Sequence, residues 1–423
     1  MASLFWVYSK TNGIDDRNWN SFIRSGSLFY WQKMKRLLGF TLFVCVLIIA
    51  SSCGGNKTPA AKAAIITDTV KKKEIIVEKK YDRTLNDISR FIAGLTPDSG
   101  SAYSSICKKD VSWKNFSTIN EKEWANVTTK RIVVMDEWAK KELQEERAKK
   151  GTIFYPFSGP DILHAITFFP DAKNYYLMAL EKCGSLPNLN EMDSAATSNY
   201  LNSIDHSLQD VFNKSYFITK KMLNDLSTAK VNGALPLICI FLERTGNEVL
   251  ETKYYHLKED GNYEETKSDS LKSFVKVDFR RIGSKEVQSV YYFKSNLENK
   301  NLDKNTGLQA FLNKMDTCTT YLKSASYLLH YKNFSTIRDI ILAKSKTVLQ
   351  DDTGIPYSYF SQDKWKVKVY GKYYKVTKDF AGVFQTDLLQ RYQKDTAKTN
   401  LPFSLGYHWG DKNQNLLKAV KQL

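Results

Sequence analysis

Apolar residues recur at two different periods along the chain, and the period changes near residue 235. Before that point the spacing is helical: Leu85, Ile88 and Ile92 lie three to four residues apart behind Thr84, which we expect to act as an N-cap. Residues 120–150 open with a capping-box spacing and predict a second helix. Residues 191–230 are polar with helical periodicity and predict two more.

The densest apolar segment, "FYPFSGPDILHAITFFPDAKNYYLMALEKCG", spans residues 154–184. The glycines and prolines between its apolar runs predict a strand, a tight turn, a short buried helix, a second turn and a buried strand. Pro160 suits the first position of the helix, because proline lacks the N–H that would be unpaired there. Pro170 is expected to end the helix.

From residue 235 onward the pattern favours strands. Short runs are separated by Thr-Gly-Asn, Asp-Gly-Asn and Ile-Gly-Ser junctions, which suit hairpin turns because Gly and Asn tolerate positive φ. The four predicted strands of this antiparallel meander are residues 235–244, 248–258, 273–281 and 286–295.

The rest of the chain predicts helices packed on that meander. Apolar residues at alternating spacings of four and three predict a long helix over residues 308–329. A short helix near 335–344, a loop at 350–356 and a last hairpin at 365–376 follow. The expected fold class is therefore α+β, with a helix-rich N-terminal domain over 81–232 and an α+β domain over 233–423.

The opening of the chain contains one short apolar run, residues 37–50. At about 14 residues it is shorter than the ~20 that a membrane-spanning helix needs. Basic residues precede it and small residues follow, a pattern typical of a secretory signal. A core strand or an N-terminal membrane anchor are the alternatives. The flanking residues are Lys33, Lys35 and Arg36 before the run and Ser51, Ser52 and Cys53 after it.

This stretch, "LFVCVLIIASSCGGNK", resembles the lipobox of bacterial lipoproteins. The resemblance implies that Cys53 receives fatty acyl chains such as palmitate and becomes the mature N-terminus. Residues 34–53 then form the signal peptide, and residues 1–33 an upstream extension before the true start at Met34. Residues 54–80 read as a flexible tether. Gly54 in the position after the cysteine favours the outer membrane, on its periplasmic face.

Charge and cysteine usage narrow the expected partners. The formal net charge is +17, which favours an anionic partner through the summed field. An exported protein would meet an anionic glycan, a lipid headgroup or another envelope protein; a solvated basic surface is the structural alternative. No nucleic-acid-binding module is recognisable.

Four cysteines remain after the predicted signal: Cys107, Cys183, Cys239 and Cys318. Two disulfides among them are possible, but burial as free thiols is favoured.

Two pairs, one of an acid with a histidine and one of two acids, are the candidate catalytic groups. Asp161 and His164 lie three residues apart on the short predicted helix and could act as acid and base or as two metal ligands. Asp161 is better explained as a structural carboxylate in the first helical turn. Asp351 and Asp352 lie together in a predicted loop, where they could bind a cation or serve a glycosidase. A turn solvated by its own acids is the favoured reading.

The sequence contains no motif for metal binding, nucleotide binding or nucleophilic catalysis. The five histidines are scattered without metal-ligand spacing, and no P-loop, dinucleotide fingerprint or nucleophile elbow is present. No metal site or cofactor is therefore predicted. Four Tyr-Tyr pairs lie in predicted strands, so that one ring of each pair points outward and could stack on a sugar. The ordinary preference of tyrosine for strands is the favoured explanation.

Three segments, "FYPFSGPDILHAITFFPDA", "STIRDIILAKSKTVLQDDTGIPYSYF" and "LPFSLGYHW", are similar to an uncharacterised family of bacterial envelope proteins. That resemblance implies a grouping without an activity. The sequence thus predicts a lipid-anchored, non-catalytic envelope protein that binds a glycan, a lipid headgroup or an envelope partner. The alternative is a hydrolase that acts on a cell-envelope polymer through the paired acids.

Overall fold

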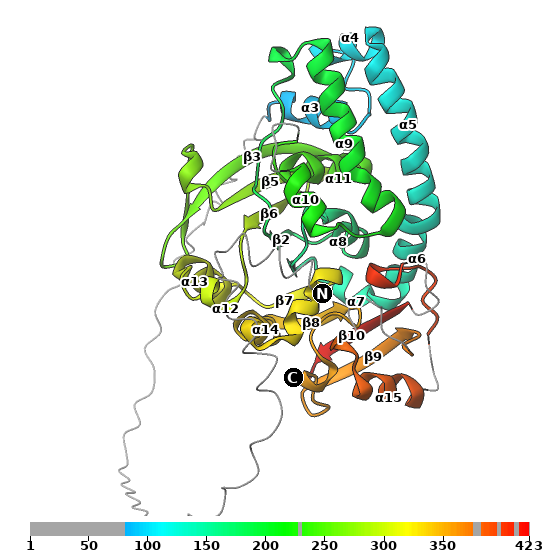
Figure 1. The fold of residues 1–423 in the computed structure, drawn as a ribbon, viewed down its shortest axis with the longest axis vertical. Coiled ribbons are helices and arrows are strands. Elements are labelled where there is room, and N and C mark those ends of the chain that lie inside the picture. Colours follow the sequence, from blue (N-terminus) through cyan, green and yellow to red (C-terminus); the bar gives the residue numbers. More distant parts are fainter. Residues whose placement is uncertain (1–80, 227–230, 375–381, 396–398, 410–413, 423) are drawn as a thin grey trace, which may run out of the picture. The chain divides into compact units, whose positions relative to one another are not determined.

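The computed structural model describes residues 81–226, 231–374, 382–395, 399–409 and 414–422 (Figure 1). They belong to one compact unit that begins at Tyr81. The predicted signal peptide, Cys53 and the tether lie outside the described residues. Within the described part of the chain, no helix is both long enough and apolar enough to cross a membrane.

One ten-stranded sheet runs through the whole unit, in the order β4-β3-β5-β6-β2-β1-β7-β8-β10-β9. Its strands are β1 (Thr152–Pro156), β2 (Asn174–Ala179), β3 (Asn247–Leu257), β4 (Tyr263–Glu265), β5 (Phe274–Arg281), β6 (Gln288–Lys294), β7 (Cys318–Leu322), β8 (Ser345–Gln350), β9 (Trp365–Gly371) and β10 (Asn415–Lys421).

The sheet is parallel at its centre and antiparallel at both edges. Strands β6, β2, β1, β7 and β8 run in the same direction. Strands β4, β3 and β5 form an antiparallel wing on one side, and β10 and β9 form another on the far side. The predicted meander of β3, β5 and β6 is confirmed, but it is only one wing of a mixed sheet.

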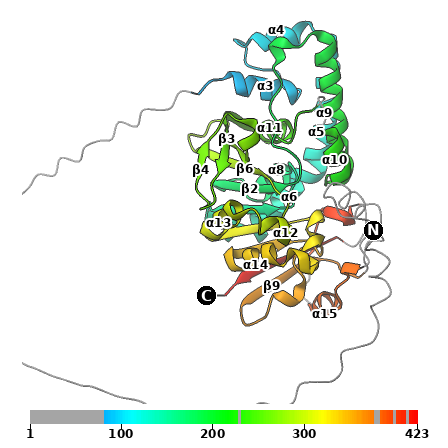
Figure 2. The same ribbon diagram turned by 60° about the vertical axis from the view of Figure 1, so that its left-hand side comes forward.

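Helices cover both faces of this sheet (Figures 1 and 2). Tyr175 of β2 donates its hydroxyl hydrogen to the Phe169 carbonyl beside α8, whereas Tyr176 packs on Phe311 of α13. Successive side chains of a strand point to opposite faces, so α8 and α13 lie on opposite faces. The helices are α3 (Thr84–Ile92), α4 (Ala102–Lys109), α5 (Val111–Val127), α6 (Val133–Glu142), α7 (Gln144–Ala148), α8 (Ile162–Phe168), α9 (Ser194–Lys214), α10 (Thr219–Asp225), α11 (Leu235–Arg244), α12 (Asn299–Leu302), α13 (Thr306–Lys314), α14 (Ser335–Lys344) and α15 (Thr386–Lys394).

In the N-terminal part of the chain the predicted helices and strands are present, but their boundaries differ from those predicted. The strand–helix–strand order of β1, α8 and β2 is confirmed, as are the two helices α9 and α10. The helix expected from residue 120 begins already at Val111, because Asp110 caps it by accepting a hydrogen bond from the Trp113 amide.

The segment 235–244 was expected as a strand and is instead the helix α11. Every side chain from Leu235 to Glu243 is buried, so the apolar run shows no period that separates a helix from a strand. Pro236 lies in the first turn of the helix, where its missing N–H costs nothing. Because α11 is buried on all its faces, a helix accommodates this apolar run as well as a strand would.

The long helix predicted over 308–329 is also wrong. Helix α13 ends at Lys314, and the chain turns at Met315 into the buried strand β7. Within that strand Thr319, Thr320 and Tyr321 favour extended backbone. The four-and-three spacing of apolar residues therefore continued across a real break between two elements.

Two longer-range predictions need correction. Strand β9 alternates as expected, with Trp365 and Val369 buried, but its partner is β10 rather than the following residues of a hairpin. The boundary expected between residues 232 and 233 crosses a single sheet, because β1 and β2 lie between β6 and β7. Helices and strands are both present, as α+β requires, yet the N-terminal part is no separate helical layer.

Candidate functional site

Three chain segments leave the sheet side by side at the carboxyl ends of its central parallel strands. Asp161 follows β1, Lys323 follows β7 and Asp351 follows β8. From β1 the chain proceeds to β2 on one side, and from β7 it proceeds to β8 on the other side. The gap between β1 and β7 is therefore a topological switch point, the place where open α/β sheets bind ligands.

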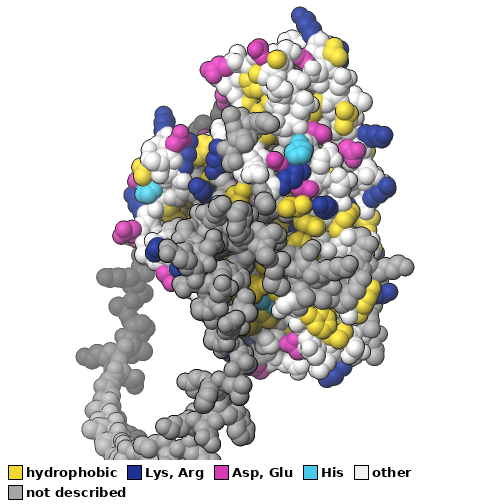
Figure 3. All heavy atoms as spheres, viewed as in Figure 1, with side chains coloured by type: hydrophobic (Ala, Val, Ile, Leu, Met, Phe, Trp, Pro, Cys, Tyr) yellow, Lys and Arg dark blue, Asp and Glu magenta, His cyan; other side chains and the backbone are white. Residues whose placement is uncertain are grey.

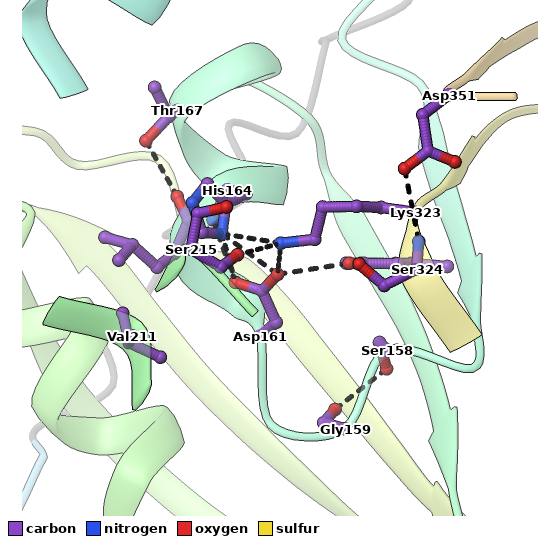
Figure 4. Close-up of polar contacts among 12 residues, drawn as sticks. Ser158, Gly159, Asp161, His164, Thr167, Val211, Ser215, Lys323, Ser324 and Asp351 are labelled. Carbon is purple, nitrogen blue, oxygen red and sulfur yellow. Dashed lines mark hydrogen bonds and ion pairs between the residues drawn. The ribbon is translucent and has the colours of Figure 1, made fainter. Parts of the chain in front are cut away.

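Asp161 caps the helix α8, as the sequence suggested, and its carboxylate also contacts three other side chains. It is the N-cap of α8, where its Oδ1 accepts a hydrogen bond from the His164 amide at 3.2 Å. The same carboxylate contacts His164 Nδ1 at 2.7 Å, Lys323 Nζ at 2.6 Å and the Tyr155 hydroxyl at 3.1 Å (Figure 4). Both oxygens of Asp161 are thus occupied by donors from the protein.

Burial and the neighbouring charges together set the charge states of this group. Burial alone would raise the pKa of Asp161, but His164 and Lys323 outweigh it and hold that pKa below its usual range. Burial lowers the pKa of His164 to about 4, so that the imidazole is neutral at pH 7. Burial also lowers the pKa of Lys323, which the ionised Asp161 opposes.

The tautomer of His164 follows from these contacts. An ionised Asp161 can only accept, so His164 Nδ1 carries the hydrogen and Nε2 carries the lone pair. The approach of Lys323 Nζ to Nδ1 at 3.1 Å is then close packing rather than a hydrogen bond. His164 Nε2 is buried and has no hydrogen-bond partner among the described residues.

Lys323 also fastens the end of α9 to this group. Its Nζ donates to the Ser215 carbonyl at 2.7 Å. Ser215 is the C-cap of α9 and has a positive φ of 67°, which a residue with a side chain rarely adopts. The sequence offered no sign of this contact, since it joins residues 108 positions apart.

The second acidic pair is buried, which corrects the expectation of a solvated turn. Asp351 is 1% exposed and accepts from the amides of Ser324 at 3.3 Å and Thr353 at 3.0 Å. Asp352 lies 3.0 Å from His408 Nε2 and accepts from Asn415 Nδ2 at 3.1 Å. Burial, and then the neighbouring Asp352, raises the pKa of Asp351 to about 6.

The two acidic pairs therefore belong to one buried group of polar residues. Lys323 contacts Asp161 and the next residue, Ser324, contacts Asp351, so a single turn after β7 joins them (Figure 4). We refer to this group as the carboxyl-edge cluster. It consists of Asp161, His164, Ser215, Tyr321, Lys323, Ser324, Asp351 and Asp352.

Unpartnered polar atoms and unusual backbone occur together in the cluster. Within the described part of the chain, four of its side chains carry a buried polar atom without a hydrogen-bond partner: His164, Ser215, Tyr321 and Ser324. Ser324, like Ser215, has a positive φ. Such atoms usually cost about 1–3 kcal/mol each, and strained backbone of this kind gathers at functional sites.

Two segments cover the cluster. One is the turn after α9, residues 215–217, and the other is residues 405–408. Tyr216 and Tyr407 meet across them with their ring centroids 5.0 Å apart, and Tyr327 lies 6.4 Å from Tyr407. These three rings are half-buried, whereas the cluster beneath them is inaccessible to solvent. Its acids therefore lie together, but in no open cleft.

Four residues of the cluster escaped prediction from the sequence. Lys323 and Ser324 lay inside the predicted long helix, which hid their position at the end of a strand. One usable signal was present: Lys323 is the single charged residue in the run "CTTYLKSASYLL". Ser215 and Tyr321 carry no signal, because only tertiary packing brings them to the cluster.

The remaining candidates behave as structural residues. The four cysteines are buried free thiols, as expected. The described residues hold no group of three or more metal-ligating side chains. Tyr176 and Tyr291 pack edge to face with ring centroids 4.8 Å apart beneath α13, so these outward rings do not present a sugar platform.

Comparison of the chain with models of protein families, with curated proteins and with solved structures found no match in any of the three.

Proposed function

We propose that this chain is a lipid-anchored, non-catalytic protein of the bacterial cell envelope that binds an anionic glycan. The anchor is Cys53, on the strength of the lipobox-like signal that ends there. Attachment through two or three acyl chains would hold the protein firmly at the periplasmic face of the outer membrane. The glycan-binding part is the unit that begins at Tyr81.

The observation that carries the non-catalytic assignment is the saturation of the candidate acids. Both oxygens of Asp161 accept hydrogen bonds from protein donors, and Asp351 and Asp352 are likewise engaged. All three are buried. A carboxylate in that state holds three strand ends together and has no access to a polymer substrate.

The half-buried tyrosines of the cover and the neighbouring Tyr327 supply a surface suited to sugars. Tyr216, Tyr327 and Tyr407 combine a flat apolar face with a polar edge, which suits a ligand that is apolar on the ring face and hydroxylated around it. Residues 1–52 hold six Lys/Arg and two Asp/Glu, so the mature chain keeps +13 of the formal net charge of +17, which adds attraction for an acidic polymer. These two features together favour an anionic glycan over a neutral one.

The glycan-binding part of the proposal is tested by sedimentation with peptidoglycan sacculi. The full chain should co-sediment with sacculi at low salt and be released as salt rises, because part of the attraction is electrostatic. A variant with both Tyr327→Ala and Tyr407→Ala should bind at least about tenfold more weakly. Tyr263→Ala, an exposed tyrosine on the distant edge strand β4, is the control. Absence of sedimentation at any salt concentration contradicts the proposal.

The anchor is tested separately in cells. A clickable fatty acid should label the wild-type protein and leave Cys53→Ala unlabelled. Protease treatment of intact cells should spare a protein on the periplasmic face. Labelling that persists in Cys53→Ala contradicts the assigned lipidation site.

A hydrolase remains the second candidate, favoured by one observation. The Asp161–His164 pair has the arrangement in which an acid orients a neutral imidazole and leaves Nε2 as a base. If this pair is catalytic, the wild type should release soluble fragments from sacculi and His164→Gln should not. Equal fragment yield from both proteins excludes this role.

A further inference from the structure

The amino ends of the central strands form a second edge of the sheet, opposite to the carboxyl-edge cluster. Strands β1, β2 and β6 run in the same direction, so the loops that precede them meet at this edge. The turn between β5 and β6 lies there too, because β5 is antiparallel to β6. We refer to these loops, residues 149–151, 170–173 and 281–287, as the amino-edge surface.

Direct contacts join the three loops into one surface. Lys150 Nζ lies 2.9 Å from Glu286 Oε2, and Arg281 Nη1 lies 3.7 Å from Asp171 Oδ1. The Lys173 amide donates to the Lys150 carbonyl at 3.2 Å. Each loop therefore contacts the other two.

Basic residues outnumber acidic ones on the amino-edge surface. Its five basic residues are all exposed: Lys149, Lys150, Lys173, Arg281 and Lys285. Its two acids, Asp171 and Glu286, each contact one of these cations. On the face shown in Figure 3 basic and acidic side chains are interspersed, so the net charge of the chain is not by itself a docking site.

The surrounding charges leave two lysines of this surface without a counter-charge. Glu145 lies one helical turn before Lys149 and offsets its charge. Lys173 and Lys285 form no ion pair with any described residue. The other neighbouring acids are matched by cations of their own: Glu248 by Arg280, Glu121 by Arg244, and Asp316 by Lys314 two residues before it.

Two apolar side chains project from the same turn as Lys285. Ile282 is 58% exposed and Val287 is 40% exposed. Exposed aliphatic groups beside lysines suit a lipid surface, which offers anionic headgroups to the ammonium groups and acyl chains to the aliphatic side chains. A glycan would be expected to pack on aromatic faces, and the amino-edge surface contains no aromatic residue.

The start of the described unit lies on the wing that carries this turn. Helix α3 begins three residues after Tyr81, and its Asn86 accepts a hydrogen bond from the Val249 amide at 3.1 Å. Val249 pairs with Phe279 near the end of β5. A lipid at Cys53, 28 positions before Tyr81, would therefore attach the unit through this wing and not through the far wing of β9 and β10.

We propose that the amino-edge surface docks on the anionic lipid headgroups of the membrane that holds the acyl chains. Lys173 and Lys285 contact the headgroup phosphates, and Ile282 and Val287 insert between the headgroups. This inference rests on the proposed anchor at Cys53, and it adds an orientation. The central strands run from the amino edge to the carboxyl edge, so docking turns the tyrosines of the cover away from the membrane and toward the glycan.

Hydrogen–deuterium exchange of the full chain with two kinds of vesicle tests the docking surface. One vesicle is phosphatidylcholine alone, and the other contains an equal part of phosphatidylglycerol. Both hold the acyl chains of the anchor, so the difference between them reports the protein surface. Amides of residues 281–287 should exchange at least about threefold more slowly with the anionic vesicle. Residues 258–260, exposed at the opposite end of β3, should exchange equally with both.

Two double variants should remove the extra protection that phosphatidylglycerol gives. Lys173→Gln with Lys285→Gln deletes the two lysines without a counter-charge, each worth about fivefold in affinity for an anionic surface. Ile282→Ser with Val287→Ser deletes the two apolar side chains. Each variant is compared with itself in the two vesicles, which cancels changes in intrinsic exchange rate.

Matched controls come from the exposed side of α5 and the residues that follow it. Ile119 and Val133 are 55% and 50% exposed, so Ile119→Ser with Val133→Ser removes a comparable apolar surface. Lys122→Gln with Lys130→Gln removes two exposed lysines. Both control variants should keep the protection of residues 281–287.

The outcomes separate this inference from the proposed function. Equal exchange of residues 281–287 with both vesicles overturns the docking surface and leaves the anchor intact, as does protection that survives in both double variants. Protection by sacculi in place of anionic vesicles also overturns it, because the surface then binds the glycan. A wild-type chain that does not float with neutral vesicles overturns the anchor. Exchange with anionic vesicles against exchange in buffer then still tests the surface.

Discussion

The parallel centre of the sheet and its antiparallel wing bury different kinds of side chain. In the wing, aromatic rings pack on one another beneath α13: Phe274 and Phe293 lie 4.5 Å apart, and Phe293 and Phe311 lie 5.1 Å apart. At the carboxyl ends of β1, β7 and β8 the buried side chains are instead charged or hydroxylated, and several lack partners.

The difference assigns stability to one region and a candidate function to the other. Burial of aromatic rings contributes favourably without any need for precise pairing. A buried ion pair contributes little net stability, because desolvation offsets the attraction. The cluster also retains unpartnered atoms and positive-φ serines. Such costs are expected to persist where a ligand site benefits from them.

The largest expected effect comes from Lys323→Met. Loss of the ammonium leaves the Asp161 charge buried without its cation, and unfolding in urea should show a loss of about 3–5 kcal/mol. Lys323→Met combined with Asp161→Asn should recover most of that loss. If the double variant is no more stable than the single one, the stability lost in Lys323→Met does not come from the unpaired charge of Asp161.

A comparable loss is expected in the wing, without any effect on binding. Phe293→Ala removes a fully buried ring that contacts Phe274, Tyr176 and Phe311, and should cost about 3–4 kcal/mol in urea unfolding. Sedimentation with sacculi should match that of the wild type at temperatures where the variant is folded. Impaired binding by the folded variant would remove the distinction between the two regions.

The pH dependence of stability should single out His164. Its pKa is about 4 in the folded chain against about 6.5 when unfolded, so between these values the unfolded chain binds more protons. Stability contributed by the neutral imidazole is present above pH 6.5 and is lost as the pH falls through 4. The full difference amounts to about 3 kcal/mol.

Asp351 acts in the opposite direction over part of that range. Its pKa is raised to about 6, so its contribution is present below pH 3.8 and is lost as the pH rises through 6. The difference in unfolding free energy between wild type and His164→Gln isolates the histidine. That difference should change by about 3 kcal/mol between pH 7 and pH 4. A constant difference would show that His164 is not buried in its neutral form.

The smallest predicted effect concerns the cover. Gly406 has a φ of +59°, and a Cβ there would contact the Asp351 carboxylate. Gly406→Ala should therefore destabilise by about 2 kcal/mol. Gly246 has a similar φ of +78° with open space around it, so Gly246→Ala should cost only about 1 kcal/mol. Equal losses in thermal unfolding would mean that residues 405–408 do not press on the cluster.

Local chemistry determined the parts of the fold that the sequence could predict. The order of β1, α8 and β2 follows from turn residues and from the carboxylate of Asp161, which caps the helix three residues before His164. The antiparallel run of β3, β5 and β6 follows from alternation and from glycine turns. The acidic pairs were visible because each pair is close in sequence.

Tertiary structure alone decided the identity of the ambiguous apolar runs and the composition of the site. Residues 235–244 and 318–322 became a helix and a strand, because burial of nearly every side chain satisfies either form and packing selects between them. Pairing of β1 with β7 then brought Lys323 to Asp161 across 162 positions. Such a contact depends on the packing of the whole sheet, and no local pattern of residues encodes it.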